Sequence, residues 1–120
     1  MIKLVLLGML TVTSYRPVPA QTKPECTSRD HCRTSIDDGI TKYGVAVSQD
    51  MLADGRVHYG DVLYVGGYGW RIVNDCMAAR HRNSIDLLVL TKPEERAVGV
   101  RHMKVYAVQR RDDEIQELPR

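Results

Sequence analysis

The stretch VLYVGGYGWRIV, residues 62–73, places two apolar runs on either side of a glycine-rich turn. Its β-branched and aromatic residues favour strands, and Gly66-Gly67 is typical of a hairpin turn. A phosphate-binding loop would need a following helix and a Lys-Ser/Thr ending, which this stretch lacks. It therefore predicts two antiparallel strands. Because side chains alternate along a strand, we expect Trp70 to face the core.

Short apolar runs separated by turn residues continue on both sides of this hairpin. Their number and spacing predict an all-β fold, a small six-stranded closed β-barrel, rather than a βαβ sheet. One short helix is expected, with Pro93 in its first turn, Glu94 at the positive end of its dipole and Gly99 ending it. The remaining predicted strands cover residues 40–43, 45–47, 85–90 and 103–108.

The N-terminus has the layout of a secretory signal peptide. Lys3 precedes the apolar run 4–10, and small residues stand at 18–20. A retained anchor is the weaker alternative, because the run is shorter than the roughly 20 residues needed to cross a bilayer. Residues 1–20 are therefore expected to lie outside the fold, and the protein to be exported to the periplasm, cell wall or extracellular space.

Behind this segment the chain divides into three expected parts. Residues 21–38 read as a polar linker, residues 39–109 as the barrel domain, and residues 110–120 as a charged, solvated tail. The 17 basic and 15 acidic residues give a net charge of +2 without a basic block, so nucleic-acid binding is not expected. The histidines show no metal-ligand spacing, and neither a metal nor a cofactor is expected.

The three cysteines leave two possibilities open. In an oxidising compartment Cys26 and Cys32 can close a small ring, or both can stay unbonded. Cys76 would then be the odd thiol, expected as a small buried side chain.

Two aspartates stand at the edges of apolar strands, Asp75 where one strand ends and Asp86 where the next begins. A buried carboxylate must find partners, such as Arg80 or Arg82 in the intervening loop, or its pKa must rise until it holds a proton. A proton-holding acid beside a bound sugar can act as the general acid of glycosidic cleavage. The alternative is that each aspartate caps a turn or pairs with arginine.

Together these segments resemble successive motifs of the 3D domain family. That family is named for three aspartates on a double-psi β-barrel, and it is similar to the catalytic barrel of membrane-bound lytic transglycosylase A. The resemblance covers residues 39–108, nearly the whole expected domain. The motifs are GITKYG at 39–44, AVSQD at 46–50, YGDVLYV at 59–65, GYG at 67–69, ND at 74–75, NSID at 83–86 and KVY at 104–106.

The resemblance implies a peptidoglycan lytic transglycosylase that acts on the bond between N-acetylmuramic acid and N-acetylglucosamine. Asp86, the third family aspartate, would be the single general acid and base. The muramic 6-hydroxyl would be the nucleophile, giving 1,6-anhydro-muropeptides. Asp75 is the second catalytic candidate. Asp50 would bind sugar hydroxyls and help keep Asp86 protonated, with Asp54 as the competing position for the first aspartate.

Further substrate-binding residues are expected at Thr41, Tyr68 and Asn83, which lie in these motifs. Family members commonly follow the second aspartate with Thr-Gly-Gly, whereas this chain has Cys76-Met77-Ala78, whose side chains keep a ligand further from the backbone. The alternative is therefore a non-catalytic, polysaccharide-binding module, as in expansin-like relatives. Either way the expected partner is the peptidoglycan glycan strand, and the mature protein is expected to be a monomer without a membrane span.

Overall fold

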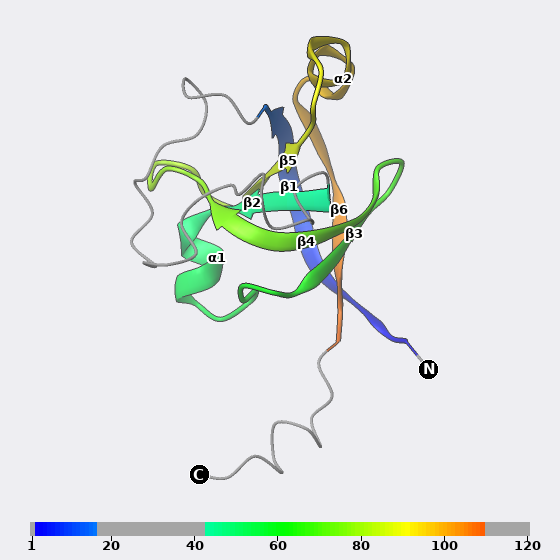
Figure 1. Cartoon of the computed structure of the whole chain (residues 1–120). Helices are drawn as coiled ribbons and strands as arrows, with labels where there is room; N and C mark the ends of the chain where they lie inside the picture. The colour runs from blue at the N-terminus through cyan, green and yellow to red at the C-terminus, as the bar shows by residue number, and fades with distance from the viewer. Residues whose placement is uncertain (1, 17–42, 110–120) are drawn as a thin grey trace, which may run out of the picture.

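Six strands and two helices make up the part of the chain that the structure, a computed structural model, describes: residues 2–16 and 43–109 (Figure 1). The strands close into one barrel, so the expected all-β barrel is confirmed. The elements are β1 Leu4–Tyr15, β2 Gly44–Val47, α1 Gln49–Ala53, β3 Val62–Val65, β4 Gly69–Cys76, β5 Ser84–Leu88, α2 Lys92–Val98 and β6 Arg101–Val108.

The order of strands around the barrel is β1-β5-β2-β4-β3-β6. β1 pairs with β5, and β2 with β4, in parallel, while the other four pairings are antiparallel. If β1 is exchanged with β4, β2 with β5 and β3 with β6, every strand keeps the same kind of neighbour, and each pairing keeps its parallel or antiparallel direction. α1 and α2 occupy equivalent places in the two halves. The barrel thus has an internal pseudo-two-fold symmetry and is compatible with a double-psi barrel.

The core fills the inside of the barrel with aliphatic side chains from all six strands. Alternate residues of each strand point inward, as the period of a strand requires. Met51 of α1 and Val98 of α2 add to the same cluster. The strand residues in this cluster are Leu10, Val12, Val45, Val47, Leu63, Val65, Val73, Ile85, Leu87, Val105 and Ala107.

The predicted hairpin at 62–73 is confirmed, since β3 and β4 pair in antiparallel register across the turn at 66–68. The expected core position of Trp70 is wrong, because its side chain is 46% exposed. Trp70 pairs with Tyr64, which faces outward because Leu63 and Val65 on either side of it face the core. The two rings meet edge to face, with centroids 5.0 Å apart.

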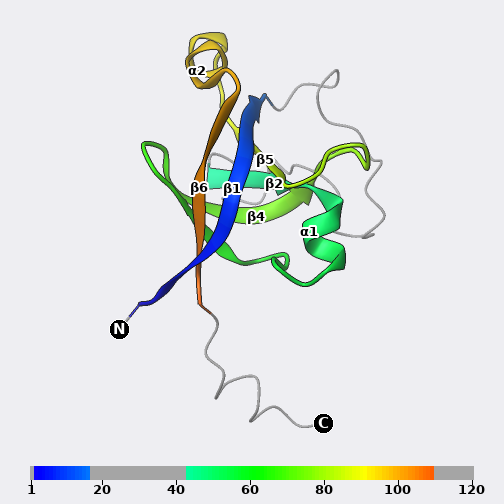
Figure 2. The ribbon, with the colours of Figure 1, turned by 180° about the vertical axis from the view of Figure 1, so that it is seen from behind.

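The expectation that residues 1–20 lie outside the fold is corrected by β1. Leu4–Tyr15 forms the longest strand and pairs with both β5 and β6 (Figures 1 and 2). Leu10 and Val12 are buried in the core. Of the strand expected at 40–43, only Tyr43 lies within the described residues, and it is not in a strand. The barrel is therefore assembled from 4–15 and 44–108 rather than from 39–109 alone.

The predicted helix near Pro93 is confirmed as α2. Thr91 and Glu94 form a capping box at its start, and Gly99 ends it with a positive φ of 59°. The five-residue α1 is an additional helix that the sequence did not predict, because it carries too few residues to show a helical period. Among the described residues, no helix has the length and apolar character to span a membrane.

Candidate functional site

Asp86 lies on the outer face of the barrel wall. Its neighbours in β5, Ile85 and Leu87, both point into the core, so alternation directs Asp86 outward. It stands in register with Thr13 of β1 on one side and with Ala46 of β2 on the other. The Thr13 hydroxyl donates a hydrogen bond to Asp86 Oδ1 at 2.8 Å.

Asp75 reaches the same face because of a β-bulge. Val45 of β2 pairs with Val73, but the next residue, Ala46, pairs with Asp75, so β4 uses an extra residue, Asn74. Strict alternation from the inward-facing Val73 would have directed Asp75 into the core. A one-residue change of register reverses the facing of every later side chain, so the bulge turns Asp75 outward.

These pairings align four residues across neighbouring strands, which we call the acid row: Thr13, Asp86, Ala46 and Asp75. Two strand spacings, about 10 Å, separate the Cα atoms of the two aspartates. The pseudo-two-fold axis passes between β5 and β2 at the centre of the row. The structure therefore brings Asp75 and Asp86 together on one face.

The surroundings of Asp86 disfavour the charged form of its carboxyl group. Burial raises its pKa to about 6, the nearby carboxylates of Asp75 and Glu95 act in the same direction, and the Thr13 hydrogen bond opposes them. Thr13 contacts only Oδ1, and no described residue hydrogen-bonds Oδ2. Asp86 is only partly buried, so its carboxyl group keeps some contact with solvent. Asp86 is thus a partly accessible acid that titrates near neutral pH.

Asp75 is more deeply enclosed than Asp86, with only 5% of its surface exposed. The backbone N–H of Cys76 donates to Asp75 Oδ1 at 2.8 Å, and the Tyr15 hydroxyl donates to Oδ2 at 3.4 Å. These bonds hold its carboxylate in place. Asp75 therefore acts on Asp86 through its charge and is poorly placed to meet a large substrate itself.

An apolar cluster borders the acid row. It consists of Tyr15, Ala46, Met77 and Leu88, which are all buried and separate from the barrel core. Met77 is held there by its own backbone, because its N–H donates to Val47 O and its carbonyl accepts from Gln49 Nε2. The loop after Asp75 thus places an apolar side chain next to the row.

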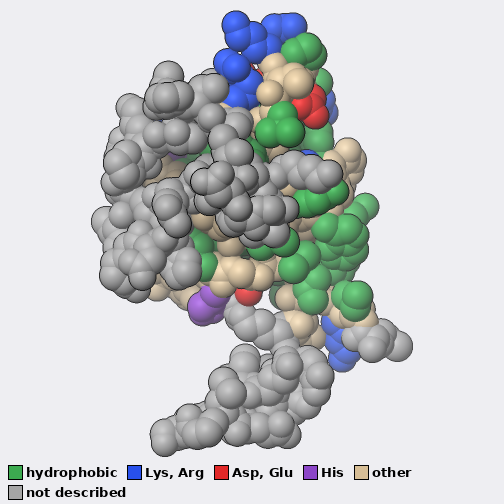
Figure 3. Space-filling view, viewed as in Figure 1, with side chains coloured by type: hydrophobic (Ala, Val, Ile, Leu, Met, Phe, Trp, Pro, Cys, Tyr) green, Lys and Arg blue, Asp and Glu red, His purple; other side chains and the backbone are tan. Residues whose placement is uncertain are grey.

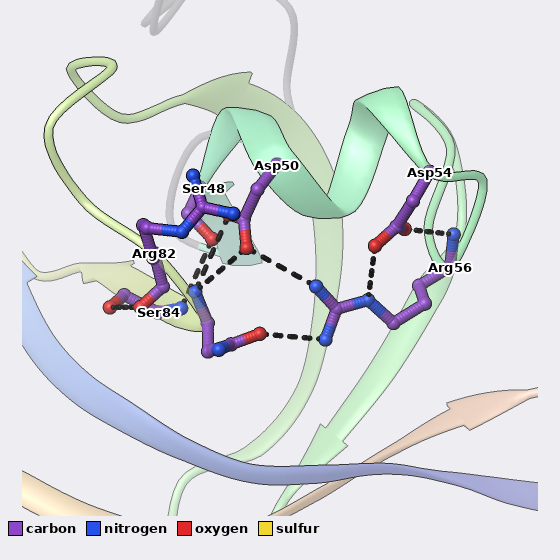
Figure 4. A network of polar contacts seen from close by, with 7 residues as sticks. Ser48, Asp50, Asp54, Arg56, Arg82 and Ser84 are labelled. Carbon is purple, nitrogen blue, oxygen red and sulfur yellow. Dashed lines mark hydrogen bonds and ion pairs between the residues drawn. The ribbon is translucent and has the colours of Figure 1, made fainter.

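Asp50 belongs to a different polar network, at the start of α1 (Figure 4). Arg56 Nη2 donates to Asp50 Oδ2 at 3.2 Å, and the backbone N–H of Asn83 donates to the same oxygen at 3.2 Å. Burial acts to raise the pKa of Asp50, but the hydrogen bonds from Ser48 and Asn83 and the positive charges of Arg56 and Arg82 outweigh it and lower that pKa.

This network locks the loop between β4 and β5 onto α1. Asn83 has a positive φ of 48°, and its side-chain oxygen accepts a hydrogen bond from Arg56 Nη1 at 2.8 Å. Asp54 pairs with Arg56 Nε at 2.9 Å on the exposed side of the network. Asp50 does not appear among the charges that raise the pKa of Asp86. Its expected electrostatic support of Asp86 is therefore supplied by Asp75 and Glu95.

Among the described residues, the other expected site residues are not gathered at the acid row. Tyr68 lies in the β3–β4 turn and packs against the barrel core. Arg82 influences Asp50 rather than Asp86. Thr41 lies outside the described residues.

Cys76 is disulfide-bonded, which corrects the expectation of a free, buried thiol. Cys26 and Cys32, expected as a possible pair, lie outside the described residues. Because the chain has only three cysteines, a bond between Cys26 and Cys32 would leave Cys76 without a partner in the same chain.

Thr13 and Tyr15, which hydrogen-bond the two aspartates, are the site residues that sequence reasoning missed. Both lie in the segment set aside as a signal peptide. Their place in a strand could have been predicted from the sequence TVTSY at 11–15, which is rich in β-branched and aromatic residues.

No group of three or more potential metal ligands occurs within the described ranges 2–16 and 43–109. In comparisons with known proteins, the chain matches no protein-family model and no curated sequence.

Proposed function

We propose that this barrel is a peptidoglycan lytic transglycosylase in which Asp86 is the single general acid and base. The observation that carries the proposal is the state of this carboxyl: it sits on the outer face of the barrel, is only partly buried, and has a pKa raised to about 6. An acid that is protonated in part near neutral pH is matched to proton transfer to a glycosidic oxygen.

The proposed reaction uses the same carboxyl twice. Asp86 gives its proton to the oxygen between N-acetylmuramic acid and N-acetylglucosamine as the bond from that oxygen to the muramic C1 breaks. The resulting carboxylate accepts the proton of the muramic 6-hydroxyl, whose oxygen forms the new bond to C1. The proton count of the enzyme is unchanged, so no second catalytic carboxylate is required, in contrast to two-carboxylate glycosidases.

The residues next to Asp86 support it in different ways. Thr13 occupies Oδ1 and so leaves Oδ2 to exchange the proton. The negative charge of Asp75 disfavours ionisation of Asp86 and so helps to keep the pKa of Asp86 raised. The hydroxyl of Tyr15 orients the carboxylate of Asp75. As positive charge develops on the sugar ring, the carboxylates of the row stabilise it electrostatically.

The second candidate function is a wall-binding module that does not cleave its ligand. Met77 favours it, because this buried side chain packs against Tyr15 and Ala46 on the same face as the acid row. An apolar side chain beside the row limits how closely a glycan backbone can approach Asp86.

Release of anhydro-muropeptides from purified sacculi tests the two candidates. We expect product from the intact protein, none from Asp86→Asn, and full activity from Asp54→Asn, a control that removes an exposed carboxylate from another network. The rate should fall as the pH rises above about 6, because the acid form of Asp86 is lost. Binding to sacculi without any product would support the second candidate.

Export remains part of the proposal. The disulfide of Cys76 supports it, because such bonds persist mainly in oxidising compartments. Removal of residues 1–20 would take away β1 together with Thr13 and Tyr15. We therefore propose that the exported form retains this strand, which the intact mass and N-terminal sequence of the protein recovered from the cell envelope would test.

A further inference from the structure

The N-terminal half of β1 has a neighbouring strand on one side only. β1 pairs with β6 from Leu4 to Val12, but its pairing with β5 covers only Thr11 to Tyr15. Within the part of the chain that the structure describes, residues 4–10 therefore have one unpaired edge. Figures 1 and 2 show this end of β1 running out beyond the closed part of the barrel.

Hydrogen-bond alternation indicates which backbone groups face that edge. Gln109 N donates to Lys3 O at 2.8 Å, so these two residues form a hydrogen-bonded pair across the β1–β6 ladder. In an antiparallel ladder such pairs alternate with pairs whose backbone groups point away from the partner strand. The N–H and C=O groups of Leu4 and Leu6 therefore point to the free edge, where they can receive another extended strand.

The side chains at this edge are apolar and unprotected. Leu6 is 49% exposed and Met9 61% exposed. Leu6 also lies in register with Tyr106, which extends an outward row through Tyr64 to Trp70. Figure 3 shows hydrophobic side chains gathered on the side of the molecule towards which β1 projects.

Edge strands of soluble proteins usually carry charges or proline that prevent pairing with another chain. The segment 4–10 has neither, and its only irregularity is the bulge at Leu7.

We propose that the free edge of β1 pairs with the same edge of a second copy, forming a two-fold dimer through antiparallel strands. The segment is complementary to itself in this orientation. Lys3 is the only charged residue among residues 2–10. Thr11 N donates to Asn83 O on the side away from β6, so two residues earlier Met9 also directs its backbone groups to the free edge. An antiparallel pairing that sets Leu4 opposite Met9 therefore places Lys3 opposite Leu10 of the partner. A parallel pairing would instead set the two Lys3 side chains side by side, which is unfavourable.

The dimer joins two β3-β6-β1 sheets into one continuous sheet and covers the exposed leucines of both copies. A two-fold contact of this kind closes on itself and does not propagate into fibres. The acid row lies on the other half of β1 and on β5, β2 and β4, so it stays open in the dimer. The dimer is independent of the proposed cleavage, and it replaces the monomer expected from the sequence.

Sedimentation velocity of the full chain over a range of concentrations tests this dimer. We expect a monomer–dimer equilibrium whose Kd rises by at least about tenfold in Leu6→Lys, because the symmetric contact receives two buried charges. Val100→Lys is the matched control, since it adds the same charge at an exposed valine away from the edge, and its Kd should equal that of the wild type.

A second measurement does not depend on any variant. In amide hydrogen exchange of the wild type, the N–H groups of Leu4 and Leu6 should become more protected as the concentration rises through the Kd. A chain that stays monomeric at its highest soluble concentration would overturn the proposal. Association that survives Leu6→Lys but is lost in Trp70→Ala would also overturn it, since the contact would then lie on the aromatic face.

Discussion

Deleting residues 1–20 should unfold the barrel. The deletion removes β1, whose Leu10 and Val12 are fully enclosed by the core and whose Tyr15 is 5% exposed. Burial of three such side chains stabilises the fold by roughly 5–9 kcal/mol, at about 1.5–3 kcal/mol each. A domain of this size has a total free energy of unfolding of about 5–15 kcal/mol. The loss is therefore of the same order as the whole stability, before the broken strand pairings are counted.

The opened barrel would also leave β5 and β6 with exposed edges, so we expect aggregation as well as unfolding. The assay compares the truncated chain with the full chain by near-ultraviolet circular dichroism, by urea unfolding and by the dispersion of amide signals in nuclear magnetic resonance. Deletion of residues 110–120 is the control, because it removes residues that belong to no described strand.

Leu10→Ala provides a graded version of the same test, with an expected loss of about 2–5 kcal/mol in the free energy of unfolding. A truncated chain that keeps the urea midpoint and near-ultraviolet spectrum of the full chain would refute the assignment of β1 to the barrel. It would then support the interpretation of residues 1–20 as a removable signal peptide.

Three other perturbations probe the acid row and its bulge. Between about pH 4 and pH 6 the folded state keeps a proton on Asp86 that the unfolded chain has released, so the free energy of unfolding should fall by up to roughly 3 kcal/mol as the pH rises through this window. Asp86→Asn should abolish this slope in urea titrations and Asp54→Asn should preserve it. An unchanged dependence of the free energy of unfolding on pH in Asp86→Asn would contradict the raised pKa of Asp86. Thr13→Val should raise the pKa of Asp86 further, because the hydrogen bond that it removes favours the charged form. Thr13→Ser should keep the hydrogen bond and the wild-type pKa. The pKa is read from the nuclear magnetic resonance signal of the Asp86 carboxyl carbon. Gly44→Ala should destabilise the barrel by about 1–3 kcal/mol, since the new Cβ would lie 2.8 Å from Asn74 Oδ1. Adding Asn74→Ala should relieve most of this loss of stability. Equal losses in the single and double variants would argue against the clash between residues 44 and 74.

Several features of the fold were predictable because they depend on local sequence. The hairpin at 62–73 follows from a turn between two β-branched runs, and α2 follows from Pro93, Glu94 and Gly99. The two aspartates were selected because a carboxylate at the edge of an apolar strand has to be compensated. None of these inferences requires knowledge of which strand lies next to which.

The role of the N-terminal segment could not be predicted in the same way. An apolar run behind one lysine is the pattern of a signal peptide and equally that of a barrel strand buried on one face. Composition cannot distinguish them, because a continuous apolar run also supplies the apolar residues at alternate positions that a strand buried on one face requires. Excluding this run also hid Thr13 and Tyr15, which contact the aspartates only after β1 pairs beside β5.

The amino-acid sequence by itself determined that this chain forms a small β-barrel and that Asp75 and Asp86 are its chemically unusual residues. Both conclusions rest on alternation, turn chemistry and the free energy needed to bury a charge. Only the tertiary structure decided that β1 closes the barrel, that the bulge at Asn74 turns Asp75 outward, and that Asp50 belongs to a separate network. The physical reason is that strand order and register depend on contacts between residues far apart in the chain, and a shift of one residue in register changes the face on which a side chain lies.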